Sequence, residues 1–105
     1  MRTLLAFLIW LGLGMPATAC ELDDLIGWTL IARKTIVAWI EQGVRQDGFQ
    51  GCRYDRIIVF QDNTGVRCRT YNYMYAYRPT AHIWGDGSSL KLCVQSSLFD
   101  VSPLR

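Results

Sequence analysis

The first nineteen residues determine how much of this chain is left to fold. One basic residue, Arg2, precedes an apolar run over residues 4–15, and Pro16 and the triplet Ala17-Thr18-Ala19 follow that run. A basic start, an apolar segment too short to span a bilayer and a small-residue boundary are typical of a secretory signal peptide. We expect cleavage after Ala19, export to the periplasm or the medium, and one small domain over residues 20–105.

All four cysteines, Cys20, Cys52, Cys68 and Cys93, lie in the exported part of the chain. An even number of cysteines in an oxidising compartment favours two disulfides, and four cysteines allow three pairings. No C-x-x-C occurs, so the usual signatures of thioredoxin-type redox sites and of zinc sites are missing.

Cys20 also has a second interpretation. Ala17-Thr18-Ala19-Cys20 resembles a degenerate bacterial lipobox, although that motif usually has Leu where this chain has Ala17. A lipid on Cys20 would anchor the protein to a membrane but would leave an odd number of thiols, and for this reason we favour a disulfide.

The exported part is rich in β-branched and aromatic residues, which favours strands over helices. Strands are predicted near residues 28–32 and 35–41, separated by the polar pair Arg33-Lys34, and a glycine-containing loop is predicted over residues 42–54.

Two hairpins are predicted in the second half of the chain. Residues 56–61 and 66–70 flank the turn Asp62-Asn63-Thr64-Gly65, and residues 81–84 and 89–94 flank Gly85-Asp86-Gly87. Residues 98–101 form a short closing strand. Together these strands predict an all-β fold, a small antiparallel barrel or sandwich of about six strands.

Tyrosines recur at every second position of one segment, as Tyr71, Tyr73, Tyr75 and Tyr77, and Arg78 follows them. In an extended chain this period places the four rings on one face. Such a face is suited to stacking on sugars or on the apolar side chains of a partner. Alternatively, the same rings fill one side of a barrel wall or cover an edge strand.

Three stretches resemble a group of small exported bacterial proteins of unknown function with an SH3-like, all-β character: residues 24–29 (DLIGWT), 56–64 (RIIVFQDNT) and 75–81 (YAYRPTA). The resemblance implies an SH3-like barrel and a Cys52–Cys68 disulfide, with Cys20 and Cys93 as additional mutual partners. A simple hairpin register around Asn63 places Cys68 opposite about residue 58, so a bridge to Cys52 requires a bend near residues 53–55. The resemblance implies no activity.

We therefore expect a non-catalytic binding module whose partner is a protein or a glycan. The chain has a formal net charge of only +2 at pH 7, which does not predict a nucleic-acid partner, and no motif implies a cofactor or a metal. One alternative is a small envelope hydrolase that uses the one histidine, His82, with an aspartate. Asp55, Asp62 and Asp86 lie near predicted turns, where Asp commonly bonds the local backbone. Another alternative is a secreted effector or inhibitor.

Overall fold

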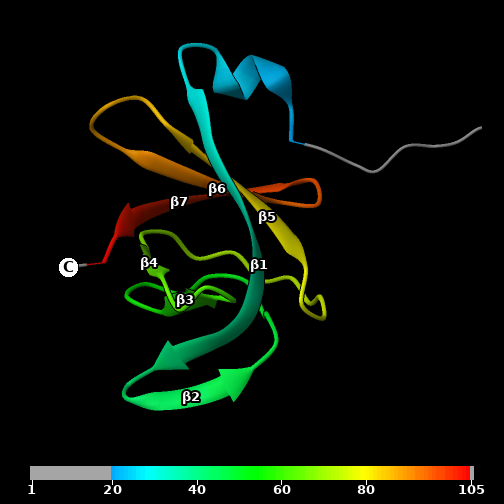
Figure 1. The fold of residues 1–105 in the computed structure, drawn as a ribbon, viewed down its shortest axis with the longest axis vertical. Helices are drawn as coiled ribbons and strands as arrows, with labels where there is room; N and C mark the ends of the chain where they lie inside the picture. Colours follow the sequence, from blue (N-terminus) through cyan, green and yellow to red (C-terminus); the bar gives the residue numbers. More distant parts are fainter. Residues whose placement is uncertain (1–19, 105) are drawn as a thin grey trace, which may run out of the picture.

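The computed structural model describes residues 20–104 (Figure 1). The predicted signal peptide, residues 1–19, lies outside the described residues. A short 3-10 helix precedes the strands, in the order η2 (Leu22–Leu25), β1 (Thr29–Glu41), β2 (Val44–Asp47), β3 (Ile57–Phe60), β4 (Gly65–Cys68), β5 (Thr80–Gly85), β6 (Leu90–Val94) and β7 (Ser97–Pro103). Over the part of the chain that the structure describes, no helix has the length and apolar character needed to cross a membrane.

Six of the strands close into an antiparallel barrel. Their order is β1-β3-β4-β7-β6-β5, and pairing of β5 with β1 completes the circle. β2 is an additional strand that pairs only with the end of β1. The prediction of a small antiparallel all-β fold is confirmed, and the fold is a closed barrel and not a sandwich.

β1 is one continuous strand, whereas two strands were predicted. Its first half, Thr29 to Thr35, pairs with β5, and its second half, Ile36 to Ile40, pairs with β3. Register shifts at 30/32 and 36/38 accompany the bend visible in Figure 1, as bulges commonly do. The polar pair Arg33-Lys34 thus lies just before the change of partner and does not end the strand.

Both predicted hairpins are confirmed. In the β3–β4 turn the Thr64 amide donates to Asp62 Oδ1 at 3.1 Å, and in the β5–β6 turn the Ser89 amide donates to Asp86 Oδ1 at 2.8 Å. These two aspartates therefore have the turn role expected for them. The closing strand is also present and runs over the whole of β7.

The predicted loop over residues 42–54 is wrong in part, because it contains β2. The residues Gln42 and Gly43 have φ values of 53° and 81°, and positive φ at both positions is typical of a tight two-residue hairpin turn. All four residues of β2 are exposed, so this strand lacks the apolar alternation by which strands are recognised in a sequence.

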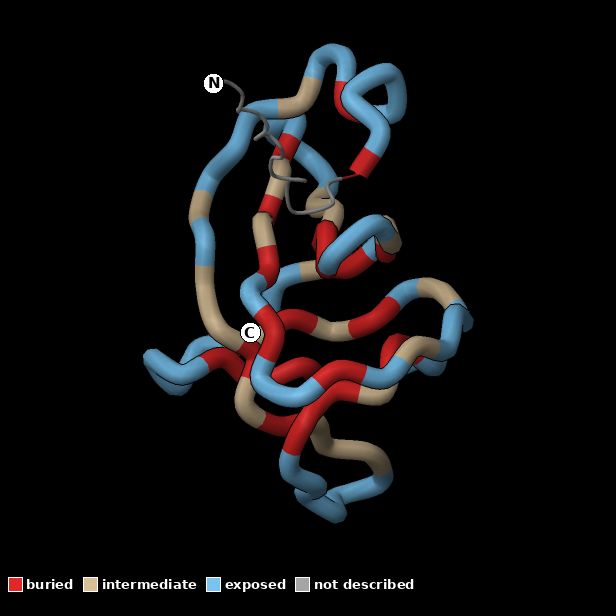
Figure 2. Tube along the Cα trace, turned by 90° about the vertical axis from the view of Figure 1, so that its right-hand side faces the viewer, coloured by how far each residue is buried: buried red, intermediate tan, exposed pale blue. Residues whose placement is uncertain are grey.

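The barrel interior is filled by buried residues that alternate with less buried ones along β4 and β5, whereas β3 and β6 each end in a run of buried residues (Figure 2). The largest fully buried side chains include Phe49, Phe60, Phe99, Ile36, Ile58 and Leu92. The rings of Phe49 and Phe99 meet edge to face, with centroids 5.7 Å apart. Phe49 comes from the connection after β2, so this connection closes part of the core.

A second, smaller cluster lies outside the barrel. Cys93 on β6 is buried together with Cys20 and Leu25, and the half-buried Trp28, Trp84 and Leu98 pack against them. The neighbours of Cys93 on β6, Leu92 and Val94, belong to the barrel core instead. Because successive side chains of a strand point to opposite faces, residues 20–28 cover the outer face of β5, β6 and β7.

Both expected disulfides, Cys20–Cys93 and Cys52–Cys68, are present. The bend expected for Cys52–Cys68 is also found, because Asp55 has a φ of 69° and the Arg56 amide donates to the Arg53 carbonyl at 2.9 Å. The expected register was two residues off, since the Cys68 amide donates to the carbonyl of Arg56 and not of residue 58.

Candidate tyrosine binding surface

The residues from Tyr71 to Tyr77, here called the tyrosine segment, connect β4 to β5 and are held at two points. The Cys52 amide donates to the Asn72 carbonyl at 2.8 Å, and the Asn72 amide donates back at 2.9 Å. Further along, the Ala76 amide donates to the Phe49 carbonyl at 3.1 Å. The tyrosine segment therefore lies along residues 49–52, here called the ledge, without forming a regular strand.

Gly51 explains how the ledge and the tyrosine segment approach so closely. Its φ is +82°, and a Cβ on this residue would lie 2.2 Å from the Asn72 carbonyl oxygen and 2.7 Å from the Met74 amide nitrogen. Both neighbours are backbone atoms, which cannot rotate away as a side chain can. Only glycine fits here, both for its conformation and for its lack of a side chain.

The four rings of the tyrosine segment are exposed. Their exposed fractions are 62% for Tyr71, 66% for Tyr73, 65% for Tyr75 and 75% for Tyr77. Between them, Ala76 is buried, and the half-buried Met74 packs against the barrel core. The interpretation of the row as a barrel wall is thus wrong, and the apolar contacts that hold the segment come from the residues between the tyrosines.

Two exposed arginines accompany the rings. The Arg53 guanidinium carbon lies 5.9 Å from the centroid of the Tyr71 ring, within the range of a cation–π contact. Arg78 follows Tyr77 with a φ of 46°, and the Pro79 carbonyl after it accepts a hydrogen bond from the Ile36 amide at 2.9 Å. Arg78 therefore lies at a sharp turn that returns the chain to the barrel.

Arg56 contacts the backbone of the ledge, and no pattern in the sequence predicts this role. Its side chain is buried, and its Nη1 atom donates to the carbonyls of Gln50 and Gly51, each at 3.2 Å. Its Nε and Nη2 atoms donate to Glu41 Oε1 at 3.0 and 2.8 Å, and its guanidinium lies 4.0 Å from the ring centroid of Trp39. In the sequence, Arg56 is simply the first residue of the strand predicted over residues 56–61.

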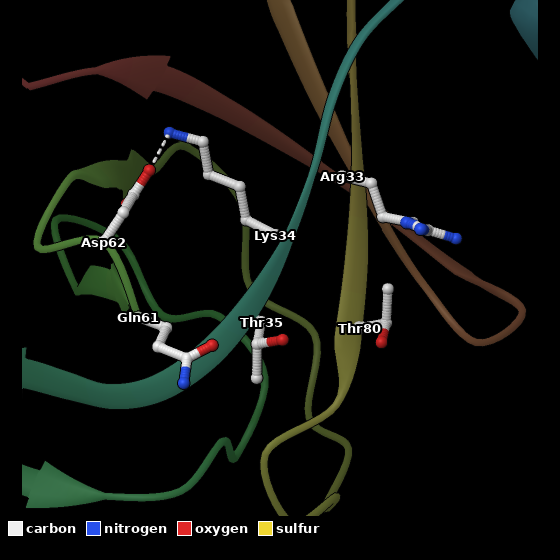
Figure 3. A pocket seen from close by; sticks show the side chains of 6 residues that line it. All are labelled: Arg33, Lys34, Thr35, Gln61, Asp62 and Thr80. Carbon is white, nitrogen blue, oxygen red and sulfur yellow. Dashed lines mark ion pairs between the residues drawn. The ribbon is translucent and has the colours of Figure 1, made fainter.

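A polar groove of about 620 Å³ lies beside the bend of β1 (Figure 3). Lys34 Nζ bridges to Asp62 Oδ2 at 2.8 Å across the groove, while Arg33 points away from this pair. The hydrogen bond from Lys34, followed by those from Thr64, lowers the pKa of Asp62 from 3.8 to about 2. Lys34 and Asp62 neutralise each other, and none of the residues predicted to bind a partner lines the groove.

His82 lies on β5, between Arg33 of β1 and Cys93 of β6. Within residues 20–104 no hydrogen bond or ion pair joins it to a carboxylate. The hydrolase alternative, which needs an aspartate beside His82, therefore finds no support in this arrangement. The same residues contain no group of three or more His, Cys, Asp or Glu placed to hold a metal ion.

Comparison with protein families, with curated proteins and with solved structures finds no match to this chain.

Proposed function

We propose that residues 20–105 form an exported, non-catalytic binding module with an SH3-like barrel, and that the tyrosine segment with Arg78 contacts a protein or a glycan. The observation that carries this proposal is the exposure of four tyrosine rings on a backbone that is fixed to the ledge. A fixed backbone lowers the entropy that binding would otherwise cost, and tyrosine adds a large contact area with few rotatable bonds.

The direct test compares stability and binding for substitutions in the tyrosine segment. Tyr73→Ala and Tyr75→Ala are each expected to change the free energy of unfolding by no more than about 0.5 kcal/mol, as is usual for surface residues. A core tyrosine would cost about 3–5 kcal/mol, by analogy with buried phenylalanine. The double variant should retain much less partner from envelope extracts than the wild type.

Val44→Ala serves as the control, because Val44 is an exposed apolar residue on β2 and does not belong to the tyrosine segment. Equal retention by the wild type, the control and the tyrosine double variant would reject the tyrosine segment as the binding surface.

We further propose that the protein is cleaved after Ala19 and lies in the periplasm or is secreted. Two disulfides are typical of oxidising compartments. A Cys20 Sγ bonded to Cys93 is also not available for a lipid. The intact mass of the exported protein should match a chain that begins at Cys20 without a lipid, and Ala19→Arg should block processing. A diacylglycerol increment, or retention of residues 1–19, would contradict this proposal.

A further inference from the structure

The tyrosine segment lies in a stretch of the chain without any carboxylate side chain. No Asp or Glu occurs between Asp62 and Asp86, while Arg67, Arg69 and Arg78 lie within these limits. Arg69 and Arg78, which flank the tyrosine segment in the chain, are exposed. Neither makes an ion pair with any of the residues that the structure describes.

Glu41, the acidic group that contacts Arg56 and Arg53, is already neutralised. Glu41 accepts two hydrogen bonds from the buried Arg56 through one oxygen, and its other oxygen lies 3.6 Å from Arg53 Nε. The two arginines and one glutamate carry a net charge of +1. The Arg53 side chain is 56% exposed and lies beside Tyr71, so this positive charge is accessible from solvent next to that ring. The exposed Asp55 is the remaining carboxylate on the connection between Cys52 and β3.

Arg69 also connects the tyrosine segment with a second aromatic surface. It lines a groove of about 370 Å³ together with Trp28 and Lys91. The one acidic residue of that groove, Asp100, is held by Lys91 at 2.7 Å. Arg69, which makes no ion pair within the described residues, is therefore two residues from Tyr71 in the chain and shares a groove with Trp28.

We propose that the tyrosine segment binds an acidic polysaccharide, a chain of uronic-acid residues. This inference rests on the proposed binding function of the segment. The tyrosine rings stack on the faces of the sugar rings, and Arg53, Arg69 and Arg78 pair with the sugar carboxylates. The guanidinium group suits this role because it is always charged and binds a carboxylate through two parallel hydrogen bonds.

The balance of rings and charges favours this ligand over other acidic polymers. Polyglutamate has the carboxylates but no ring faces for the four tyrosines. A nucleic acid carries a charge at every phosphate, and its affinity grows with the number of Lys and Arg contacts. A polyuronate carries one carboxylate per sugar ring, fewer than the two phosphates per base pair of a nucleic-acid duplex, and a few arginines on a chain of net charge +2 match it better.

The test titrates the purified exported protein with polygalacturonate oligomers and with their methyl esters, which keep the sugar backbone and lose the charge. We expect the acidic form to bind and the ester to bind at least about tenfold more weakly. Added salt should weaken binding, because exposed charges are screened. Tyr73→Ala with Tyr75→Ala should weaken binding about tenfold or more, as loss of aromatic stacking does in other sites. Arg78→Gln should weaken it several-fold.

Arg33→Gln is the matched control, since Arg33 is an exposed arginine on the separate polar groove, and it should leave the affinity unchanged. Equal affinity for the ester, or tighter binding of polyglutamate or oligothymidylate, would overturn the inference. So would failure of polygalacturonate to bind. If tyrosine-dependent capture from envelope extracts persists in that case, only the acidic polysaccharide is rejected. If that capture is also absent, the proposed function fails with it.

Discussion

Arg56 is a buried cation that donates four hydrogen bonds to two kinds of acceptor. The carboxylate of Glu41 neutralises its charge, and the carbonyls of Gln50 and Gly51 take the remaining contacts from one end of the guanidinium. Because those carbonyls belong to the ledge, this side chain links the end of β1 to the backbone that carries the tyrosine segment. A buried charge with satisfied partners is tolerated, but loss of either partner is costly.

Replacing Arg56 by Met should therefore lower the free energy of unfolding by about 3 kcal/mol, near the lower end expected for breaking a buried ion pair. The lower end applies because the Glu41 side chain is 26% exposed and water can partly solvate it. Arg56→Lys should recover only part of the loss, since one ammonium cannot reach the carboxylate and both carbonyls together. Urea unfolding measures both variants. Arg53→Gln, at a mostly exposed pair, should cost less than about 1 kcal/mol, and a similar loss for Arg53 and Arg56 would contradict this account.

Asp62 gives the protein a defined sensitivity to acid. Its pKa is about 2 in the folded protein, against an ordinary value of 3.8, so folding favours the ionised form. The resulting stabilisation is complete above a pH of about 4 and is lost as the pH falls towards 2. NMR titration of the Asp62 carboxyl carbon measures this pKa directly.

Asp62→Asn should flatten the dependence of the unfolding midpoint on pH in that same window. The dependence should not vanish, because hydrogen bonds from Ser88 and Ser89 also lower the pKa of Asp86. An unchanged pH profile in Asp62→Asn would show that the Lys34–Asp62 pair has no such effect in solution.

At the scale of strands, the sequence predicted an element correctly where a turn motif and the spacing of apolar residues indicate the same pair of strands. Asp62-Asn63-Thr64-Gly65 lies between an apolar run and its partner, and the hairpin formed there as predicted. β2 was missed because a fully exposed strand has no apolar period, and its formation depends on pairing with β1. β1 was predicted as two strands, because the local sequence does not show that a continuous strand changes its pairing partner at this point.

The candidate site was predictable in part for a related reason. Alternation places Tyr71, Tyr73, Tyr75 and Tyr77 together, whether they face the core or the solvent. The choice between these two faces depends on Met74 and Ala76 packing inward against a barrel formed by distant residues. Arg56 could not be recognised at all, because its partners Glu41, Gln50 and Gly51 come together only in the folded chain.

The contact between the ledge and the tyrosine segment leads to a prediction for Gly51. Gly51→Ala places a methyl group against the backbone of Asn72 and Met74, so the two segments must separate. We expect a loss of more than about 2 kcal/mol in stability, beyond the roughly 1 kcal/mol of backbone strain. Hydrogen exchange at the amides of Cys52 and Asn72 should become faster.

Gly48→Ala is the control that isolates this steric effect. Gly48 also has a positive φ, +96°, but a Cβ there would meet nothing within 4 Å. This variant should show only the backbone strain and leave the exchange of the Asn72 amide unchanged. Equal effects of the two substitutions would mean that close packing under the tyrosine segment is unimportant.

Residues 20–104 contain two apolar clusters, each with its own disulfide. Cys52–Cys68 lies in the barrel core, whereas Cys20–Cys93 fastens residues 20–28 to the outer face of the barrel. The backbone hydrogen bonds found within residues 20–28, from Asp24 to Glu21 and from Trp28 to Leu25, are local. Residues 20–28, here called the covering segment, are therefore held against the barrel by the Cys20–Cys93 disulfide and by the packing of Leu25 and Trp28.

Removing each bridge separately tests this division. Chain entropy alone ranks Cys20–Cys93 as more stabilising by about 1.3 kcal/mol, because its sequence separation is 73 against 16 for Cys52–Cys68. Hydrogen-bond partners reverse the order for serine variants, although all four cysteines are buried. The carbonyl oxygens of Ser97 and Gln95 lie 3.3 Å from Cys20 Sγ and 3.5 Å from Cys93 Sγ, so serine hydroxyls at these positions have acceptors within reach. A serine hydroxyl left without a partner at Cys52 or Cys68 costs about 1–3 kcal/mol.

We expect Cys52→Ser with Cys68→Ser to destabilise the protein more than Cys20→Ser with Cys93→Ser does. The latter variant should keep a folded barrel but release residues 20–28, since no other covalent link holds them to the outer face. Urea unfolding gives the order of the two losses, and a red shift of tryptophan fluorescence under native conditions reports exposure of Trp28 and Trp84. If instead the Cys20–Cys93 variant unfolds the barrel, the two clusters form one cooperative core, and the covering segment is as essential to the fold as the strands beneath it.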